Sequence, residues 1–313
     1  MADPILHIKD SYFFEVPKFL TAEKRYESEL EVPQFLRAAH PTATLEDFNH
    51  AMRGKILIPQ PFGKRKNLFE RESGFLISKF MVLEVVAAIF LFFVFKKFAA
   101  AISSKEPPKG RWNNIVETMV VFVRDKIART AIAHHADHFV PILGTLFFFI
   151  LVLNLMGMLP WLGSPTAAFS VTLSLALVTW VVGFTAGTRE FGPVGFWTNM
   201  VPHIDMPKWL TPLKWLIMLM LLVIEILGMF IKHVVLGIRL LANMVAGHLV
   251  LLAILGMVVA AANSSFGGWA TTTTIGVLGS TLLSVLELGV AFLQAFVFTF
   301  LSALFINMAS HAH

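Results

Sequence analysis

The sequence contains no cysteine and few charged residues. None of its 313 residues is a cysteine, which excludes disulfides, thiolate metal sites and cysteine nucleophiles. Only 14% of the residues are charged and two are tyrosines, whereas 30 are phenylalanines and 56% are hydrophobic. The mean hydropathy of +0.72 is far above that of an ordinary soluble domain. This composition is typical of an integral membrane protein, in which phenylalanine fills lipid-facing and interhelical space.

Several enzyme motifs are also absent. The sequence has no GxxxxGK[ST] loop, GxSxG turn or HExxH pair, so we expect no bond-cleaving chemistry and no cofactor in this chain. The first residues, MADPILHIKDSYFF, lack an apolar run ending at a small-residue cleavage site, which predicts no cleaved signal peptide. The net charge of +5 is assigned to cytoplasmic loops and not to nucleic-acid binding.

The N-terminal region differs from the rest of the chain. Residues 1–75 are polar, of mixed charge and repeatedly interrupted by proline, which predicts a peripheral arm and not a large domain. One short helix is expected from Thr44 to Met52, because Thr-Leu-Glu-Asp is a typical helix start.

The remaining residues, 76–313, predict an all-α membrane domain. Five apolar segments are expected to span the membrane, at about 78–97, 139–160, 166–186, 212–262 and 272–309. Residues 110–136 have apolar side chains at helical spacing, from Ile115 to Ala131, and are expected to form an amphipathic helix on the membrane surface. Residues 192–212 are expected to form a loop and 263–274 a turn, because they are rich in proline or in glycine, serine and threonine.

The fourth and fifth apolar segments are too long to stand upright in a membrane. Residues 213–262 would extend about 75 Å as a helix, more than twice the hydrocarbon core. The fourth segment therefore either folds back near its polar middle or forms one steeply tilted helix. Two long tilted helices in a hairpin explain the length of both segments.

The distribution of charge predicts the topology. Eight Lys and Arg residues lie between Lys96 and Asp137 against four acids, whereas residues 160–166 and 263–274 carry no charge. The positive-inside rule places the former in the cytoplasm. Five spans then place the N-terminus outside and the C-terminus inside, in a bacterial inner membrane or, alternatively, an organellar inner membrane.

Ionisable residues interrupt the two long apolar segments. Those in the fourth segment are Glu225, Lys232, His233, Arg239 and His248, and the fifth contains Glu287. Intramembrane charge is costly, so each of these needs a reason. On a helix, Glu225, Lys232, Arg239 and Asn243 lie within about 40° of one line, while His248 lies about 180° from Arg239. Arg239 and His248 are therefore expected to serve different surfaces.

Two such polar faces on antiparallel helices predict an aqueous path. Glu287 and Gln294 are seven residues apart and share one face of the last helix. His248 and Glu287 are able to exchange protons, and Arg239 would block the path to other cations. The alternatives are a snorkelling or structurally paired Arg239 and a purely structural hydrogen bond between His248 and Glu287.

Two other sets of residues have simpler interpretations. Glu225 and Lys232 are seven residues apart, so they either neutralise each other or line the path. His134, His135 and His138 are clustered in sequence but lack further ligands, so we expect no metal site there.

The segment from Gly237 to His248, GIRLLANMVAGH, resembles the signature of the subunit a family of ATP synthases. The resemblance extends to NLMGMLP and SPTAAFSVTLSLAL between Asn154 and Leu177 and to LELGVAFLQAFVF at 286–298. It implies a proton-translocating stator subunit that forms two half-channels against a ring of subunit c and couples ion flow to rotation. Subunit b of the peripheral stalk is an implied partner, and the transported ion is expected to be H⁺.

The family resemblance also implies roles for single residues. Arg239 is expected to face the ring carboxylate and to separate the half-channels. The implied neighbours of the arginine are Asn243 and Gln294, and the implied half-channel residues are Glu225, His248 and Glu287. Many bacterial members of the family carry Glu at the position of His248 and His at the position of Glu287. This chain has the two residues in the opposite order, so it still has one acid and one imidazole between the two helices.

Three positions depart from the family pattern, and two other classes of protein stay open. His233 replaces a common proline, Val235 a small or hydroxyl residue, and Ala168 a usual Asn or Asp. A secondary transporter would need inverted repeats, which the sequence does not show. A non-conducting anchor would leave Arg239 in the membrane without a purpose.

Overall fold

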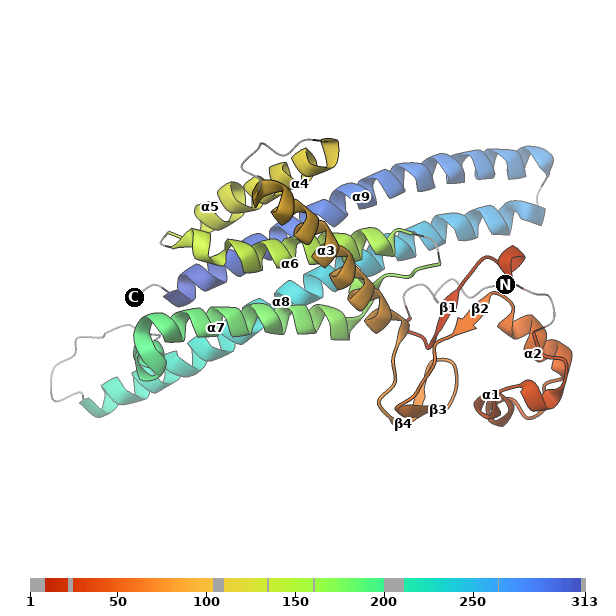
Figure 1. Cartoon of the computed structure of the whole chain (residues 1–313), viewed down its shortest axis with the longest axis horizontal. Helices are drawn as coiled ribbons and strands as arrows, with labels where there is room; N and C mark the ends of the chain where they lie inside the picture. Colours follow the sequence, from red (N-terminus) through yellow and green to blue (C-terminus); the bar gives the residue numbers. More distant parts are fainter. Residues whose placement is uncertain are drawn as a thin grey trace. The chain divides into compact units, whose positions relative to one another are not determined.

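The chain is mostly helical, as its sequence predicts (Figure 1). The computed structural model describes residues 9–21, 25–103, 110–133, 135–159, 161–199, 211–263 and 265–310. The chain forms two compact units, each assembled from three segments. The first unit contains Met1–Phe92, Val152–Ala168 and Met244–Leu288, and the second contains Phe93–Leu151, Phe169–Asn243 and Gly289–His313.

The N-terminal arm of the first unit is folded around a small core. Its elements are β1 (Phe13–Glu15), α1 (Gln34–Ala39), α2 (Leu45–Met52), β2 (Lys55–Leu57), β3 (Gly63–Arg65) and β4 (Arg71–Gly74). Strand β1 pairs antiparallel with β2, and β3 with β4. Tyr26, Val32, Leu36, Phe48 and Met52 form the core. The sequence did not predict the strands, because three or four residues are too few for a visible alternation.

The predicted helix from Thr44 to Met52 is confirmed as α2, with Thr44 as its N-cap residue. The Thr44 hydroxyl accepts the Asp47 backbone N–H at 3.3 Å, and the Asp47 carboxylate accepts the Thr44 backbone N–H at 2.9 Å. These reciprocal bonds satisfy two N–H groups that have no partner inside the helix. Hydrogen bonds from the Thr44 side chain and backbone lower the pKa of Asp47 below its usual value.

The arm is bonded directly to the start of α3 (Lys79–Ser103). The Lys79 backbone N–H donates to the Ser11 carbonyl at 2.8 Å, and the Phe80 N–H to the Asp10 carboxylate at 3.3 Å. Burial raises the pKa of Asp10 despite these donors. The arm and the first turn of α3 therefore belong to one folded piece.

Four helical segments in the described part of the chain are long and apolar enough to cross a membrane. They are Ala136–Gly157, Phe169–Trp197, Leu213–Asn263 and Phe266–Ser310. The first predicted span corresponds to α3, which has 25 residues but carries Lys79, Glu84, Lys96 and Lys97 and is not among the four. Four of the five predicted spans therefore correspond to helices of spanning length and apolarity.

The predicted surface helix at 110–136 is interrupted by a wider π-helical turn. It consists of α4 (Arg111–Phe122), the π-helical turn η4 (Val123–Ala128) and α5 (Arg129–Ala131). Val123, Ile127 and Ala128 are completely buried, whereas the side chains of Trp112 and Ile115 in the first half are exposed. Only the second half of the predicted apolar face is therefore covered by the protein.

Helices α6 (Ala136–Gly157) and α7 (Phe169–Asn199) follow, and α7 is longer than predicted. The expected end at Gly187 is wrong, because this glycine is a close-packing position. A Cβ there would collide with the Phe196 ring and the Ala309 carbonyl. The helix is interrupted only at Gly192, whose φ of 75° is left-handed, and then continues to Asn199. The loop predicted at 192–212 is thus wrong up to residue 199, and residues 200–210 lie outside the described ranges.

The last two helices are α8 (Thr211–Ala260), with 50 residues, and α9 (Phe266–Ser310), with 45. Since α8 is one continuous helix, the fold-back alternative is wrong. Helix α9 begins before the predicted residue 272, because Ser265 starts it: its hydroxyl accepts the Gly268 N–H at 3.4 Å and its carbonyl the Trp269 N–H at 2.8 Å. The hydroxyls of Thr271 and Thr274 are satisfied inside the helix by the carbonyls of Gly267 and Ala270. The predicted turn at 263–274 is correspondingly shorter.

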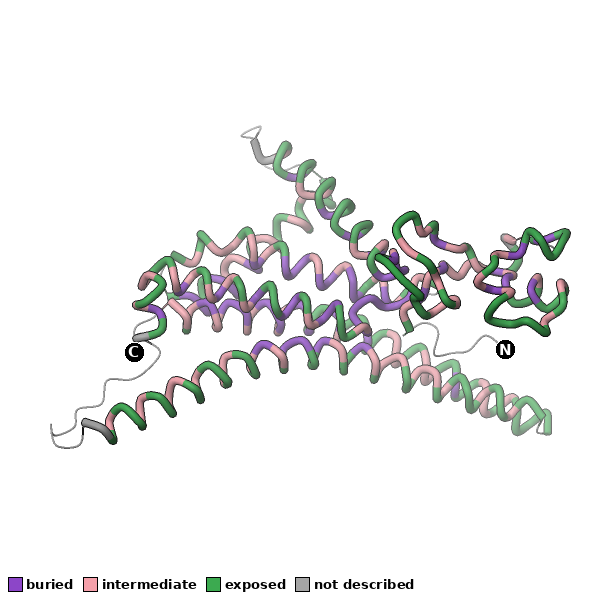
Figure 2. Tube along the Cα trace, turned by 90° about the horizontal axis from the view of Figure 1, so that it is seen from below, coloured by how far each residue is buried: buried purple, intermediate pink, exposed green. Residues whose placement is uncertain are grey.

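Helix α8 is unusually exposed for such an apolar helix. Most of its length is exposed or half-buried, and its buried residues gather near its middle (Figure 2). Those buried side chains are His233, Leu236, Leu240 and Met244. An apolar helix of this kind needs lipid or another protein along its free faces.

Candidate functional site

The first unit places His248 of α8 beside Glu287 of α9. The imidazole Nδ1 lies 3.5 Å from the Glu287 Oε1, and the two side chains are only 15% and 10% exposed. Glu287 Oε1 is buried and accepts no hydrogen bond from any residue that the structure describes. The predicted pairing of these two residues is therefore present, and the carboxylate retains its capacity to accept a proton.

Both ring nitrogens of His248 lie against backbone carbonyls. Nδ1 is 3.0 Å from the Met244 oxygen, and Nε2 is 3.2 Å from the Gly157 oxygen. A neutral imidazole has one N–H and can donate only one of these bonds, whereas an imidazolium donates both. The carbonyls and the nearby Glu287 carboxylate thus provide partners for the protonated ring.

Two glycines make room for this pair. A Cβ on Gly247 would collide with the Glu287 carboxylate, so glycine lets the acid lie against the α8 backbone. A Cβ on Gly157 would lie 2.6 Å from the Ser164 hydroxyl, within the turn that joins α6 to α7. The Gly157 carbonyl also contacts the His248 ring, so this turn holds one hydrogen-bond partner of the imidazole in place.

In the second unit, Arg239 lies on the exposed face of α8. Gly237 and Met244, which lie about 160° and 140° around the helix from Arg239, are buried, so the helix packs on the side away from the arginine. Packing there is close, since a Cβ on Gly237 would lie 2.9 Å from the Thr172 carbonyl of α7. Arg239 forms no hydrogen bond or ion pair with the described residues. The structural-pair alternative for Arg239 therefore finds no partner in these ranges.

Asn243 lies one turn after Arg239 and is held by α9. Its amide Nδ2 donates to the Gln294 Oε1 at 2.6 Å. Gln294 is 4% exposed, whereas Asn243 is exposed. Asn243 and Gln294, the two implied neighbours of the arginine, are thus bonded to each other, and this bond fixes the α8 turn that carries Arg239 against the last helix.

The other ionisable residues of α8 have local partners. Glu225 and Lys232 lie 3.9 Å apart with their side chains 42% and 39% exposed, in agreement with mutual neutralisation. His233 is buried, its Nδ1 contacts the Met229 carbonyl at 2.8 Å, and its ring centroid lies 4.7 Å from that of Phe305. His233 therefore has a packing role.

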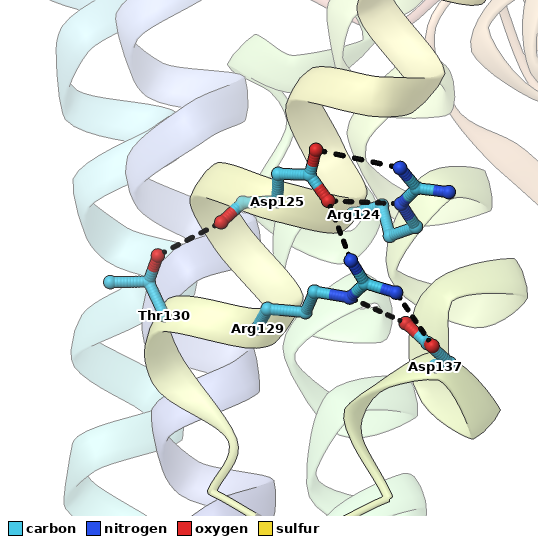
Figure 3. Close-up of polar contacts among 5 residues, drawn as sticks. All are labelled: Arg124, Asp125, Arg129, Thr130 and Asp137. Atoms are coloured by element: carbon cyan, nitrogen blue, oxygen red, sulfur yellow. Dashed lines mark hydrogen bonds and ion pairs between the residues drawn. The ribbon is translucent and has the colours of Figure 1, made fainter.

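Sequence reasoning missed an ion-pair network between the surface helix and α6 (Figure 3). Arg129 donates to Asp137 at 2.9 and 2.8 Å and to Asp125 at 3.3 Å, and Arg124 donates to Asp125 at 2.9 Å. The Arg124 hydrogen bond is the main reason why the pKa of Asp125 is lowered. A signal was available in the i, i+4 spacing of Asp125 and Arg129. The network joins α5 to the first turn of α6.

The histidines near this network do not form a metal site within the described ranges. No group of three or more His, Cys, Asp or Glu residues with metal-binding geometry occurs there. His135 has a left-handed φ of 56° and His138 stacks edge-on against Phe139. His134, the third member of the sequence cluster, lies outside the described residues.

These features define a class of protein: a helical membrane protein with a buried acid–imidazole pair and an exposed arginine on its longest apolar helix. The sequence profile of the family described as ATP synthase A chain matches residues 80–307. The chain therefore belongs to this family and is a membrane-embedded subunit of the ATP synthase type.

Similar proteins support the family assignment over nearly the whole chain. ATP synthase subunit a of an Anaeromyxobacter species is 36% identical over 98% of this chain and 70% of its own length. ATP synthase subunit a of Myxococcus xanthus is 36% identical over 74% of this chain and 72% of its own. That of Chloroherpeton thalassium is 34% identical over 86% and 78%, respectively.

Proposed function

We propose that this chain is the proton-translocating stator subunit of the membrane sector of a rotary ATP synthase. It forms two half-channels against a ring of subunit c and couples proton flow to rotation of the ring. The exposed arginine of α8 supports this proposal most directly. An apolar helix that presents an unpaired cation needs a partner surface with a complementary charge.

The contacts of His248 and Glu287 support the half-channel role that we propose for them. A proton that arrives on the imidazole produces a ring that donates to both the Met244 and Gly157 carbonyls. This proton then passes to the Glu287 carboxylate, whose Oε1 lies 3.5 Å from Nδ1. An imidazole and a carboxylate are suited to this exchange because both gain and lose protons readily.

Arg239 separates the two half-channels. When a carboxyl group of the ring comes opposite Arg239, the guanidinium favours its ionised form. The carboxyl group must therefore release its proton before it passes the arginine. A guanidinium remains charged throughout, so it repels protons that would otherwise pass directly between the half-channels. Asn243 and Gln294 hold the helix turn behind it, and Glu225 lines the path at the other end of α8.

The topology completes the proposal. Helix α3 is the first of five spans, the segment α4 to α5 lies on the cytoplasmic membrane surface, and the N-terminal arm lies outside. With 50 residues, α8 is about 75 Å long, so it crosses the hydrocarbon core only if strongly tilted. The complex lies in a bacterial inner membrane, and subunit b of the stalk is the second partner.

ATP-driven proton pumping in vesicles carrying the whole complex tests this function. Arg239→Ala is expected to abolish pumping while ATP hydrolysis persists and an immunoblot shows complete assembly. The matched control is Arg111→Ala, which removes an exposed arginine from the start of α4. Wild-type pumping by an assembled Arg239→Ala complex would favour a non-conducting anchor.

A further inference from the structure

The second unit contains a large cavity for which the proposed function has no use. Its volume is about 890 Å³, and its walls come from α6, α7, α9 and the segment before α6. Pockets of about 300–1,000 Å³ are the size that proteins use for drug-sized ligands. The lining includes the apolar side chains of Ile132, Phe139, Ile142, Val182 and Phe191.

The lining of the cavity also carries opposite charges. Arg189 and Glu190 are consecutive on α7, both are exposed, and both line the cavity. Neither forms a hydrogen bond or ion pair with any residue in the described ranges. The imidazole and amide groups of His138 and Asn307 belong to the same lining. The cavity therefore offers a cation, an anion and neutral polar groups beside an apolar surface.

This combination matches one chemical class of ligand. We propose that the cavity binds a glycerophospholipid whose headgroup carries both a phosphate and an ammonium group. The Arg189 guanidinium binds the phosphate through paired N–H donors, and Glu190 binds the ammonium. The acyl chains lie along the apolar side chains, most of which belong to α6 and α7, two helices of membrane-spanning length.

Other ligands use only part of the cavity. Inorganic phosphate would leave the apolar side chains without contacts. A phospholipid without an amine would leave Glu190 opposite a phosphate of like charge, which weakens binding. A basic pocket between membrane helices is a common headgroup site, and the added carboxylate changes its preference from anionic to zwitterionic lipids.

Lipid retention by the purified whole complex tests the proposal. The complex is stripped of lipid in detergent and incubated with an equal mixture of phosphatidylethanolamine and phosphatidylglycerol, and bound lipid is counted by mass spectrometry. The complex is expected to retain phosphatidylethanolamine preferentially. Arg189→Gln should reduce retention of both lipids, and Glu190→Gln should abolish the preference. Arg111→Gln and Glu117→Gln, on the exposed face of α4, are the matched controls.

Two further measurements locate the ligand and identify its source. A photoreactive phosphatidylethanolamine is expected to label peptides covering 135–142 and 182–191, and Arg189→Gln should reduce that labelling about tenfold. Free phosphoethanolamine at millimolar concentration should compete only weakly, because it lacks acyl chains. Labelling unchanged in Arg189→Gln, or equal retention of the two lipids by the wild type, would overturn the proposal. Complete displacement by free phosphoethanolamine would assign the cavity to a soluble phosphate ester instead.

Discussion

Two polar sites on α8 differ in whether the chain itself supplies partners for the charged side chain. His248, in the first unit, is half-buried, contacts two carbonyls and lies beside the buried Glu287. Arg239, in the second unit, is exposed and has no partner in the described residues. One helix therefore carries one polar site with partners inside the chain and another without a partner in the described residues, for which the proposed function supplies the ring.

This difference indicates how the work is divided between the chain and its partner. Proton exchange between an imidazole and a carboxylate needs fixed geometry, which the glycines and carbonyls around His248 supply. An arginine that meets successive carboxylates of a moving ring must remain free of permanent partners. The isolated chain is thus expected to bind and exchange protons but not to drive or follow rotation.

After the complete loss of pumping expected for Arg239→Ala, the next largest effect is expected at the His248–Glu287 site. Glu287→Gln keeps the size of the side chain but removes the proton acceptor, so ATP-driven pumping should fall about 100-fold or more. Glu117→Gln, on the exposed face of α4, is the matched control and should pump normally. A Glu287→Gln complex that pumps at the wild-type rate would show that the buried pair is structural, and the comparison between the two sites would fail.

A smaller effect is expected from the glycine that supports this pair. Gly247→Ala places a methyl group against the Glu287 carboxylate, so the acid must move away from the α8 backbone. We expect pumping to fall about tenfold, the cost of misplacing a proton-transfer group by a fraction of an ångström. Gly256→Ala, on the same helix, adds its methyl group in open space and should leave pumping unchanged. Equal pumping rates for the two variants would contradict this account.

The bond behind Arg239 should contribute mainly to stability. Asn243→Ala leaves the buried Gln294 carbonyl without its donor and should destabilise the chain by about 1–3 kcal/mol. Thermal unfolding of the detergent-solubilised complex measures this as a lower Tm, and pumping should fall less than in Glu287→Gln. The double variant Asn243→Ala, Gln294→Leu should recover most of the lost Tm, because both polar partners are then removed. Without such recovery, the loss in Asn243→Ala has another cause.

The smallest effect is expected in the N-terminal arm. Thr44→Ala removes the N-cap hydroxyl of α2, so amide hydrogen exchange from Phe48 to Met52 should accelerate about fivefold, while pumping is unchanged. The pKa of Asp47 is lowered in the folded arm, so its contribution to stability is present above the unfolded pKa, near 4, and is lost as the pH falls through the lower folded pKa. Acid also slows the intrinsic exchange of every amide, so the quantity to compare is the protection factor, which acidification should lower more in the wild type than in Thr44→Ala. An equal response in the two proteins would exclude the capping box as the cause.

The sequence predicted those features that depend on local pattern. Thr44 marked the start of α2 correctly, and helices of spanning length lie close to four of the predicted segments. His248 and Glu287 were expected to meet on facing helices and are in contact, whereas the bond between Asn243 and Gln294 was not predicted. Helical spacing limits which faces can meet, so the first of these contacts follows from residue positions.

Other features depended on tertiary contacts that the sequence does not show. Gly187 looked like a helix end but is a packing position against Phe196 and Ala309. Thr271 and Thr274 looked like turn residues, yet their hydroxyls bond back to the helix. The π-helical turn at 123–128 and the opposite charges in the cavity became visible only in three dimensions. The common source of error was a residue type that often ends a helix or forms a turn but that here lies inside a helix.

Cysteine cross-linking in the assembled complex tests most directly whether a ring covers the exposed face of α8. The chain has no cysteine, so single replacements are unambiguous. Ala242 is exposed about one turn after Arg239, whereas Leu240 is buried. Ala242→Cys is expected to form a disulfide with a cysteine placed beside the ring carboxylate, and Leu240→Cys is not. If Ala242→Cys does not cross-link and reacts with a lipid-soluble maleimide as fast as in the isolated chain, the arginine face meets lipid and the stator account is contradicted.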